Sequence, residues 1–199
     1  KQIYLGTSQI EDDTAFSESV LARVSSVNPF YRRLNAVKAF DVLLAHGTDM
    51  ATDPALDFVY LHVPLPHQPT IYDAHQKQFT ALNFGRDGYF HNVAAVDVFL
   101  SRLRQAMKET NIWDTTTIVI SADHGWRAPP PLSDFQDRGK IAFFIKMAQQ
   151  NKGNVYNIPF SATSLKPLML ALSSGELIDI QKLTEWMRLP RNRFIPSTD

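Results

Sequence analysis

A carboxylate and an imidazole stand side by side at Asp123 and His124, directly after the apolar run at residues 117–121. Divalent cations such as zinc and manganese bind this mixture of ligands, with the oxygen and nitrogen about 2 Å from the ion. The run has the composition of a buried strand, and in open α/β sheets ligands bind beyond the carboxyl ends of strands. Gly125 follows and keeps this point free of side-chain bulk. The sequence therefore predicts two metal ligands here; the alternative is a strand-end turn in which Asp123 caps the next segment.

Four further histidines come from segments that a β-loop-α-β unit would bring to one edge of a sheet. Residues 58–63 and 115–122 predict two strands, with a long loop at 64–88 and a helix at 89–110 between them. Such units are parallel and right-handed. We therefore expect five histidines to gather at one sheet edge, namely His62, His67, His75, His91 and His124.

Three of these histidines are candidates for substrate binding. His67 lies in the proline-rich part of the loop, where functional residues are common; its alternative is a solvated imidazole. His62 alternates with apolar residues along the predicted strand, which is more typical of a core histidine with satisfied hydrogen bonds. His91 lies in the first turn of the predicted helix, a position that attracts anions.

Two residues directly after the Asp-His-Gly motif add candidate substrate contacts. Arg127 carries a planar guanidinium that matches phosphate and sulfate, and the ring of Trp126 can form the wall of a pocket. The alternative is packing of both side chains under the prolines at 129–131. The sequence supports the two interpretations about equally.

The composition excludes several classes of function. The chain has 199 residues, 44% of them hydrophobic and 20% charged, which is enough for one globular domain with a sizeable core. Its 20 Lys and Arg balance 20 Asp and Glu, so we expect no nucleic-acid partner. It has no cysteine, which excludes disulfides, thiolate metal sites and a cysteine nucleophile. No apolar run reaches the roughly 20 residues that span a bilayer.

The pattern along the chain predicts a single α/β domain over residues 1–199, with a mostly parallel sheet flanked by helices. Residues 1–55 are predicted as a mostly helical lead-in, with helices at 17–27 and 29–44. A third strand is predicted at 141–146, after a second long loop at 127–140. The last predictions are helices at 161–173 and 176–187, separated by Gly175, and an irregular tail at 190–199.

Several segments together resemble the alkaline phosphatase superfamily, in its branch of sulfatase-like hydrolases and transferases. The likeness covers about residues 55–175 and is strongest at 117–125, with support from 61–69, 89–114, 143–149 and 161–172. The resemblance implies an alkaline phosphatase-like fold in which zinc, manganese or calcium assists transfer of a phosphoryl or sulfuryl group to a Ser, Thr or formylglycine nucleophile. It makes Asp123 and His124 ligands of one ion and places His67 near the substrate. It also implies an extracytoplasmic or periplasmic location and a membrane-attached parent protein.

The upstream half of this family's pattern is not recognisable, and no catalytic nucleophile is identified. The formylglycine signature needs Cys or Ser two residues before a proline and Arg two residues after it, but Val27 and Tyr31 flank Pro29 in this way. We therefore expect this chain to be the C-terminal portion, with an incomplete sheet, of a metal-dependent hydrolase or transferase of phosphate or sulfate esters.

Two other interpretations stay open. A non-catalytic fragment or degenerate family member would keep the fold for binding or assembly, which the missing nucleophile segment favours. An unrelated α/β nucleotide- or sugar-binding domain would need a glycine-rich phosphate loop, which the sequence lacks. Because an incomplete sheet leaves an unpaired edge, we expect a homodimer through this edge if the chain is a fragment.

Overall fold

The computed structural model describes residues 2–5, 28–82, 84–125, 140–157 and 159–192. The chain divides into two compact units, Lys1–Ile112 and Trp113–Asp199, and each unit is described by itself. The predicted helix at 17–27 lies outside the described residues.

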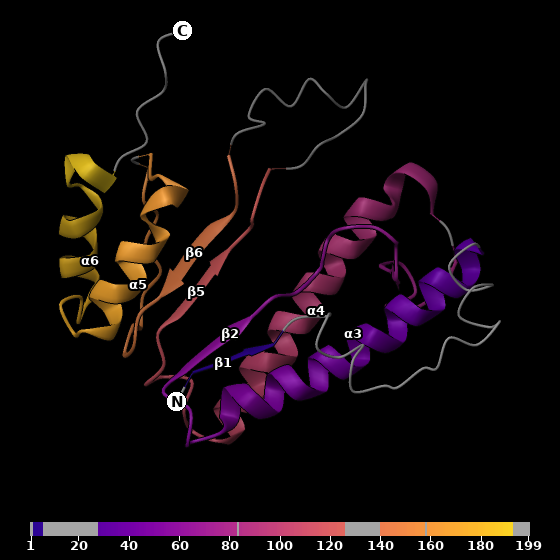
Figure 1. The fold of residues 1–199 in the computed structure, drawn as a ribbon, viewed down its shortest axis with the longest axis horizontal. Helices are drawn as coiled ribbons and strands as arrows, with labels where there is room; N and C mark the ends of the chain where they lie inside the picture. Colours follow the sequence, from indigo (N-terminus) through magenta and orange to yellow (C-terminus); the bar gives the residue numbers. More distant parts are fainter. Residues whose placement is uncertain (1, 6–27, 83, 126–139, 158, 193–199) are drawn as a thin grey trace, which may run out of the picture. The chain divides into compact units, whose positions relative to one another are not determined.

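A parallel pair of strands and a long helix form the first part of unit 1 (Figure 1). Strand β1 (Gln2–Leu5) pairs in parallel with β2 (Phe58–Leu61), and helix α3 (Pro29–Thr52) lies between them in the sequence. The Asn28 side chain caps α3 by accepting a hydrogen bond from Phe30 N–H at 2.9 Å. Strand β1 was not predicted, because the pattern of residues 1–55 indicates mostly helix.

Helix α3 extends eight residues beyond its predicted end, from 44 to 52. Packing explains part of the extension: the helix passes close to β2 at Gly47, where an added Cβ would lie 3.4 Å from Leu61 Cδ1, in ordinary van der Waals contact. The Thr48 hydroxyl also donates to Leu44 O at 2.7 Å within the added turns. Contact with β2 therefore supports a helix whose local hydrophobic pattern ends earlier.

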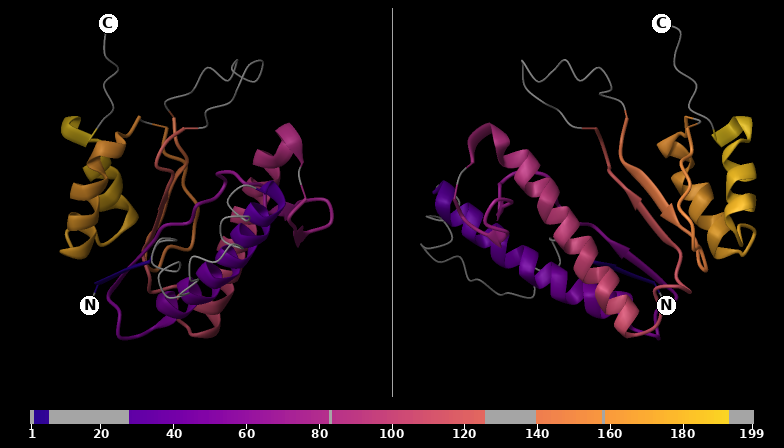
Figure 2. Two further views of the ribbon diagram at one scale, coloured as in Figure 1. Left: turned by 45° about the vertical axis from the view of Figure 1, so that its right-hand side comes forward. Right: turned by 180° about the vertical axis from the view of Figure 1, so that it is seen from behind.

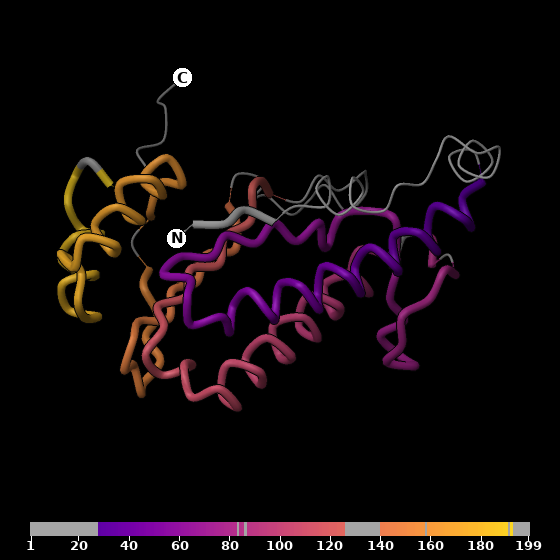
Figure 3. Tube along the Cα trace, turned by 60° about the horizontal axis from the view of Figure 1, so that its bottom comes forward, coloured from indigo at the N-terminus to yellow at the C-terminus, as the bar shows by residue number. Residues whose placement is uncertain are grey.

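Helix α4 (Gly88–Glu109) confirms the helix predicted at 89–110 and lies beside α3 (Figure 3). Phe99, from the predicted apolar stripe, is buried, and its ring centroid lies 6.1 Å from that of Phe40 on α3. The stripe was wrong at Val93, which is 43% exposed. The polar residues His91 and Asn92 are buried at that end of the helix because their side chains bind backbone groups of the preceding loop. The main buried cluster comprises Phe40, Leu44, Ile71 and Phe99.

The loop predicted at 64–88 contains short regular elements. Strands β3 (Tyr72–Asp73) and β4 (Gln78–Phe79) form an antiparallel pair, and a 3-10 turn, η1 (Gly85–Asp87), leads into α4. Gly88 has an ordinary helical φ of −54°, so its role is steric: an added Cβ would lie 2.0 Å from the Thr70 hydroxyl oxygen. The loop is thus packed tightly against the start of α4.

Unit 2 contains an antiparallel strand pair, β5 (Ile118–Ser121) and β6 (Phe143–Lys146). These strands confirm two predicted segments, 115–122 and 141–146, in shortened form. This pair does not add to the mostly parallel sheet that was expected. A parallel connection needs a crossover, usually a helix, and the intervening sequence carries three consecutive prolines, which disfavour one.

Two helices cover β6 on one side of unit 2 (Figure 2). The turn η3 (Ala162–Ser164) leads into α5 (Leu165–Ser173), and α6 (Ile180–Met187) follows Gly175, whose φ of +75° ends the first helix as predicted. Helix α6 begins four residues later than predicted, because the Asp179 side chain caps it by accepting from Lys182 N–H at 2.8 Å. The core comprises Met147, Leu168, Ala171, Leu177, Leu183, Trp186 and Met187.

These elements give an α/β protein whose described strands form one parallel and two antiparallel pairs. A mostly parallel sheet is not confirmed, and the predicted unit joining β2 to β5 stays a prediction. The predicted tail at 190–199 starts with a 3-10 turn, η4 (Pro190–Asn192), and residues 193–199 lie outside the described part. Among the described helices, each is too short or too polar to cross a membrane.

Candidate metal and substrate-binding residues

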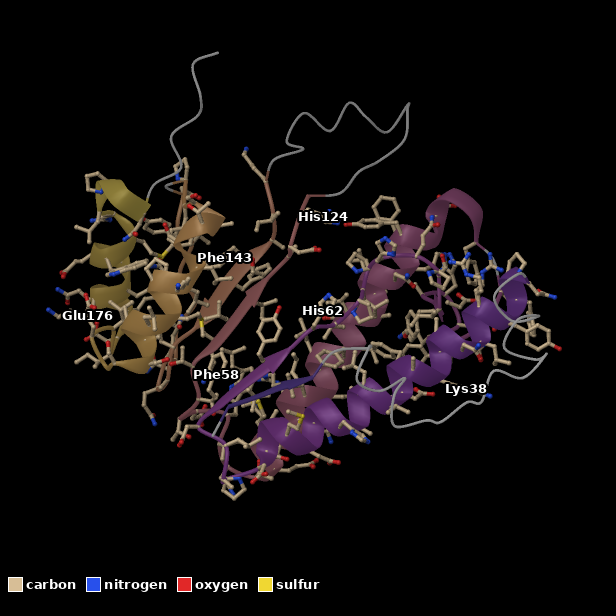
Figure 4. All side chains as sticks on the ribbon, viewed as in Figure 1. Lys38, Phe58, His62, His124, Phe143 and Glu176 are labelled. Carbon is tan, nitrogen blue, oxygen red and sulfur yellow. The ribbon has the colours of Figure 1, made fainter. Side chains whose placement is uncertain are left out.

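Asp123 and His124 form an exposed turn directly after β5 (Figure 4). Ala122 N–H donates to Ala142 O at 3.2 Å, which continues the strand pair up to this turn. The Asp123 carboxylate then accepts from His124 N–H at 2.9 Å, and its other oxygen lies 3.8 Å from His124 Nε2. The side chains are 81% and 46% exposed, respectively. The structure therefore brings the two predicted ligands together at the carboxyl end of a strand.

The ring of His124 is oriented as in many metal-binding histidines. Its Nδ1 lies 2.8 Å from Gly125 O, and because a carbonyl can only accept, Nδ1 carries the proton. In the neutral imidazole, Nε2 then has a free lone pair 3.8 Å from the Asp123 carboxylate. Metal-bound histidines commonly donate their second ring N–H to a carbonyl in this way, which fixes the tautomer.

This pair provides only part of a metal site. A catalytic zinc ion takes at least three protein ligands. Within the described ranges, no group of three or more His, Asp and Glu side chains could hold an ion. The donor chemistry of Asp123 and His124 thus fits a divalent cation, and the remaining ligands must come from outside this pair.

His67 lies in the loop that follows β2 and is exposed. Its Nδ1 is 2.7 Å from Gln68 O, so this imidazole has the same tautomer as His124 and a free Nε2. The backbone carbonyl of His67 accepts a hydrogen bond at 2.9 Å from the Asn92 side chain on α4. His62 stands at the end of β2 and is also exposed (Figure 4), which is contrary to the core position that its pattern favoured.

His91 is buried in the first turn of α4, with 6% of its surface exposed. Its Nδ1 accepts a hydrogen bond from Ala74 N–H at 2.9 Å and lies 4.0 Å from the Asp73 carboxylate. The ring stacks on Phe84 with centroids 4.3 Å apart, and it meets the ring of His75 edge-on at 5.3 Å. These contacts make His91 part of the packing of the loop; its role in substrate binding stays a prediction.

Asn92 is a residue of this region whose role was not predicted. It is fully buried and binds four backbone groups of the loop that carries His67. An asparagine next to a histidine in a helix gives no signal of such a role. The signal in the sequence was indirect: a polar residue on the face where the apolar stripe should continue.

Lys146 holds the other end of the β5–β6 pair, away from Asp123. Its Nζ donates to Trp113 O and, at 2.8 Å, to Thr116 O just before β5. Burial lowers the pKa of Lys146 below its ordinary value of 10.5, and the charge of Asp114 partly opposes this shift. These bonds fix the start of the strand that ends at the Asp-His turn.

The predicted site residues thus fall into two groups. In unit 1, Asn92 links the His67 loop to the turn of α4 that contains His91. In unit 2, Asp123 and His124 lie next to each other. Trp126 and Arg127 lie outside the described residues. The gathering of five histidines at one sheet edge stays a prediction.

An α/β fold with an Asp-His pair at a strand end is consistent with an alkaline phosphatase-like domain. Residues 4–147, which are 144 of the 199 residues, match the family model of type I phosphodiesterase / nucleotide pyrophosphatase. The chain therefore belongs to this family, which is part of the alkaline phosphatase superfamily, and the predicted resemblance is confirmed at that level. The family is typically metal-dependent. Comparisons with curated proteins and with solved structures give no match.

Proposed function

We propose that this protein is a metal-dependent hydrolase or transferase of phosphate esters, in which Asp123 and His124 bind the cation and His67 contacts the ester. One observation carries the proposal: a histidine with a free Nε2 stands 3.8 Å from a carboxylate oxygen, beyond a strand end inside the segment that matches the family. Phosphodiesters and pyrophosphates are the first substrates to test, because the family model is described by them. Sulfate esters are the alternative substrate class.

Each residue has a defined part in this proposal. A bound divalent ion would polarise the ester oxygen and stabilise the charge that develops during transfer. Asp123 and His124 present an oxygen and a nitrogen for that ion, while Gly125 O keeps the proton of His124 on Nδ1. His67 presents Nε2 at the surface of its loop, where it can accept a proton or, when protonated, donate one to an ester oxygen. Trp126 and Arg127 are proposed to contact the anionic group.

Calorimetric titration with Zn²⁺ and with Mn²⁺ tests the metal site. We expect saturable binding to the wild-type protein and loss of that binding in Asp123→Asn. Asp97→Asn is the matched control, because it makes the same change at an exposed carboxylate on α4 and should bind the ion normally. Assays with an aryl phosphodiester and an aryl sulfate, with and without the ion, then compare the two ester classes.

The outcomes separate the alternatives. Turnover of the phosphodiester that depends on both the ion and Asp123 supports the proposal. Turnover of the aryl sulfate alone overturns its ester class. Absence of ion binding overturns the proposal as a whole and favours the non-catalytic role in binding or assembly. Light scattering independently tests the homodimer, which, like the extracytoplasmic or periplasmic location and the membrane attachment, we retain as a proposal.

A further inference from the structure

A single buried amide holds the backbone of the loop that presents His67. Asn92 Nδ2 lies 2.9 Å from His67 O, 3.1 Å from Pro69 O and 3.4 Å from Pro66 O, while its Oδ1 accepts from Ile71 N–H at 3.0 Å. The asparagine is fully buried, and its partners precede it by 21 to 26 residues. We propose that Asn92 is a positioning residue that sets the place and tautomer of His67 for contact with the ester.

The hydrogen-bond capacity of the amide is well matched to this loop. An asparagine amide has two N–H donors and one acceptor oxygen. The two donors serve the closest carbonyls, those of His67 and Pro69, and the oxygen serves the only N–H directed at it from this segment, that of Ile71. A buried amide costs stability unless it is satisfied in this way. Asn92 therefore specifies one backbone path from residue 66 to residue 71.

The path fixed by Asn92 also controls the imidazole of His67. The His67 carbonyl is directed inward to Asn92, while the side chain is exposed. The Nδ1 proton is donated to Gln68 O, the carbonyl between the two that Asn92 binds most closely. A change in the backbone at 67–69 would move Gln68 O away from Nδ1 and release the ring. The position of Nε2 thus depends on a residue that does not touch it.

This inference depends on the proposed function only for its catalytic consequence, the contact between His67 and an ester. The placement of His67 by Asn92 is a structural statement and is testable without any substrate. Displacements of about 1 Å from a productive position cost up to about 100-fold in rate, and loss of an outer-shell partner costs about 10–100-fold. We therefore expect kcat/KM to fall about 10–100-fold when Asn92 loses its donors.

The test uses Asn92→Asp, which keeps the shape and the acceptor for Ile71 N–H but directs an oxygen at three carbonyl oxygens. The first measurement is the 15N chemical shift pattern of the His67 ring. We expect the Nδ1-protonated tautomer in the wild-type protein and a mixture of tautomers in the variant. The second is kcat/KM for the aryl phosphodiester in Asn92→Asp, in His67→Ala and in the double variant. We expect the double variant to lose about as much activity as His67→Ala alone, so that the two fold-losses do not multiply.

The controls separate positioning from folding. Met107→Ala removes a buried side chain from the same helix, 15 residues away, and should change neither the His67 tautomer nor kcat/KM in the folded protein. If Asn92→Asp does not fold, Asn92→Ser is used, because it leaves a small space that water can fill. Either variant is compared at a temperature where its thermal unfolding curve shows a folded protein.

The outcomes are distinct from those of the proposed function. An unchanged His67 tautomer in a folded Asn92 variant overturns the inference, whatever the activity. Losses of kcat/KM that multiply in the double variant also overturn it, because Asn92 would then act independently of His67. If the wild-type protein turns over no ester, the proposed function fails, and a changed tautomer still supports the placement of His67 by Asn92.

Discussion

The His67 loop and the Asp123–His124 turn reach the same histidine geometry in different ways. In both, Nδ1 donates to the carbonyl of the next residue, at 2.7 Å and 2.8 Å, and Nε2 stays free. The loop is also fixed by a buried side chain from a distant helix, whereas the side chains of Asp123 and His124 make their described contacts with residues adjacent in sequence. Each ring is thus oriented by a contact with its own neighbour in sequence. Among the described residues, a side chain from a distant element holds the backbone of the loop, whereas no such side chain holds the backbone of the turn.

The largest effect on stability is expected from removing the amide that holds the loop. Asn92→Ala leaves three carbonyls and one N–H without this partner, and each buried group left unpaired costs about 1–3 kcal/mol. Because water can reach some of them, we expect the free energy of unfolding to fall by about 3–5 kcal/mol, measured by urea denaturation. A loss below about 1 kcal/mol would show that the loop is held by other contacts. Hydrogen exchange at Ile71 N–H should also accelerate.

The sequence could predict the residues of the turn but not the support of the loop. Asp123 and His124 are neighbours in the sequence, and the apolar run before them predicts a strand. Asn92 acts across more than 20 residues, and its partners are backbone groups, which are the same for every residue type. Nothing in the pattern of residues 64–71 indicates where their carbonyls point. Contacts of this kind are fixed by the fold and leave only a polar residue on an otherwise apolar helix face.

A second, smaller effect is expected where the loop passes the start of α4. In Gly88→Ala the new Cβ would lie 2.0 Å from Thr70 Oγ1, so we expect a loss of about 2–3 kcal/mol in the free energy of unfolding. The sign of this change in the free energy of unfolding is informative, because alanine otherwise stabilises a helix by about 1 kcal/mol relative to glycine.

The double variant Gly88→Ala/Thr70→Ala is the matched control for this contact. The nearest remaining Thr70 atom is Cβ at 3.2 Å, so most of the overlap disappears and we expect a favourable coupling of about 1–2 kcal/mol. Additive effects of the two substitutions would show that the loop does not approach α4 this closely.

The fold shows the same division between local and long-range information. The helices 29–44 and 89–110 and the strands of unit 2 were predicted in place because each has its own apolar pattern. Strand β1 was missed because four residues carry too little pattern, and its strand character comes from pairing with β2. The direction of the β5–β6 pair was not predicted, because pairing direction depends on the connection between two strands and not on the apolar pattern of each strand.

A third effect concerns the hydrogen bonds by which Lys146 on β6 holds the backbone just before β5 in unit 2. Lys146→Met removes two hydrogen bonds from an ammonium to backbone carbonyls before β5, and we expect a loss of about 1–2 kcal/mol in the free energy of unfolding. If the Asp-His turn is held locally, binding of Zn²⁺ at saturation should survive this change. Loss of Zn²⁺ binding in a folded Lys146→Met variant would contradict a locally held turn.

The pH dependence of Lys146 gives a further check on this support. Burial lowers its pKa in the folded protein below 10.5, so the unfolded chain binds more protons between the lowered pKa and 10.5. The contribution of Lys146 to the free energy of unfolding therefore rises with pH across that window. Denaturation at several alkaline pH values should show this rise in the wild-type protein relative to Lys146→Met. Parallel curves would show that the amine is solvated.

The smallest effect is expected at the turn itself. Asp123→Asn keeps an oxygen that can accept from His124 N–H, and the side chain is 81% exposed, so the free energy of unfolding should change by no more than about 0.5 kcal/mol without metal. With Zn²⁺ at 100 times its dissociation constant, the wild-type protein should gain about 2.7 kcal/mol and the variant much less. A large loss in Asp123→Asn without metal would mean that the carboxylate supports the fold. The contrast with Asn92 would then disappear, because contacts within the protein would hold the Asp123–His124 turn as well as the His67 loop. The bound ion would not be needed to stabilise the turn.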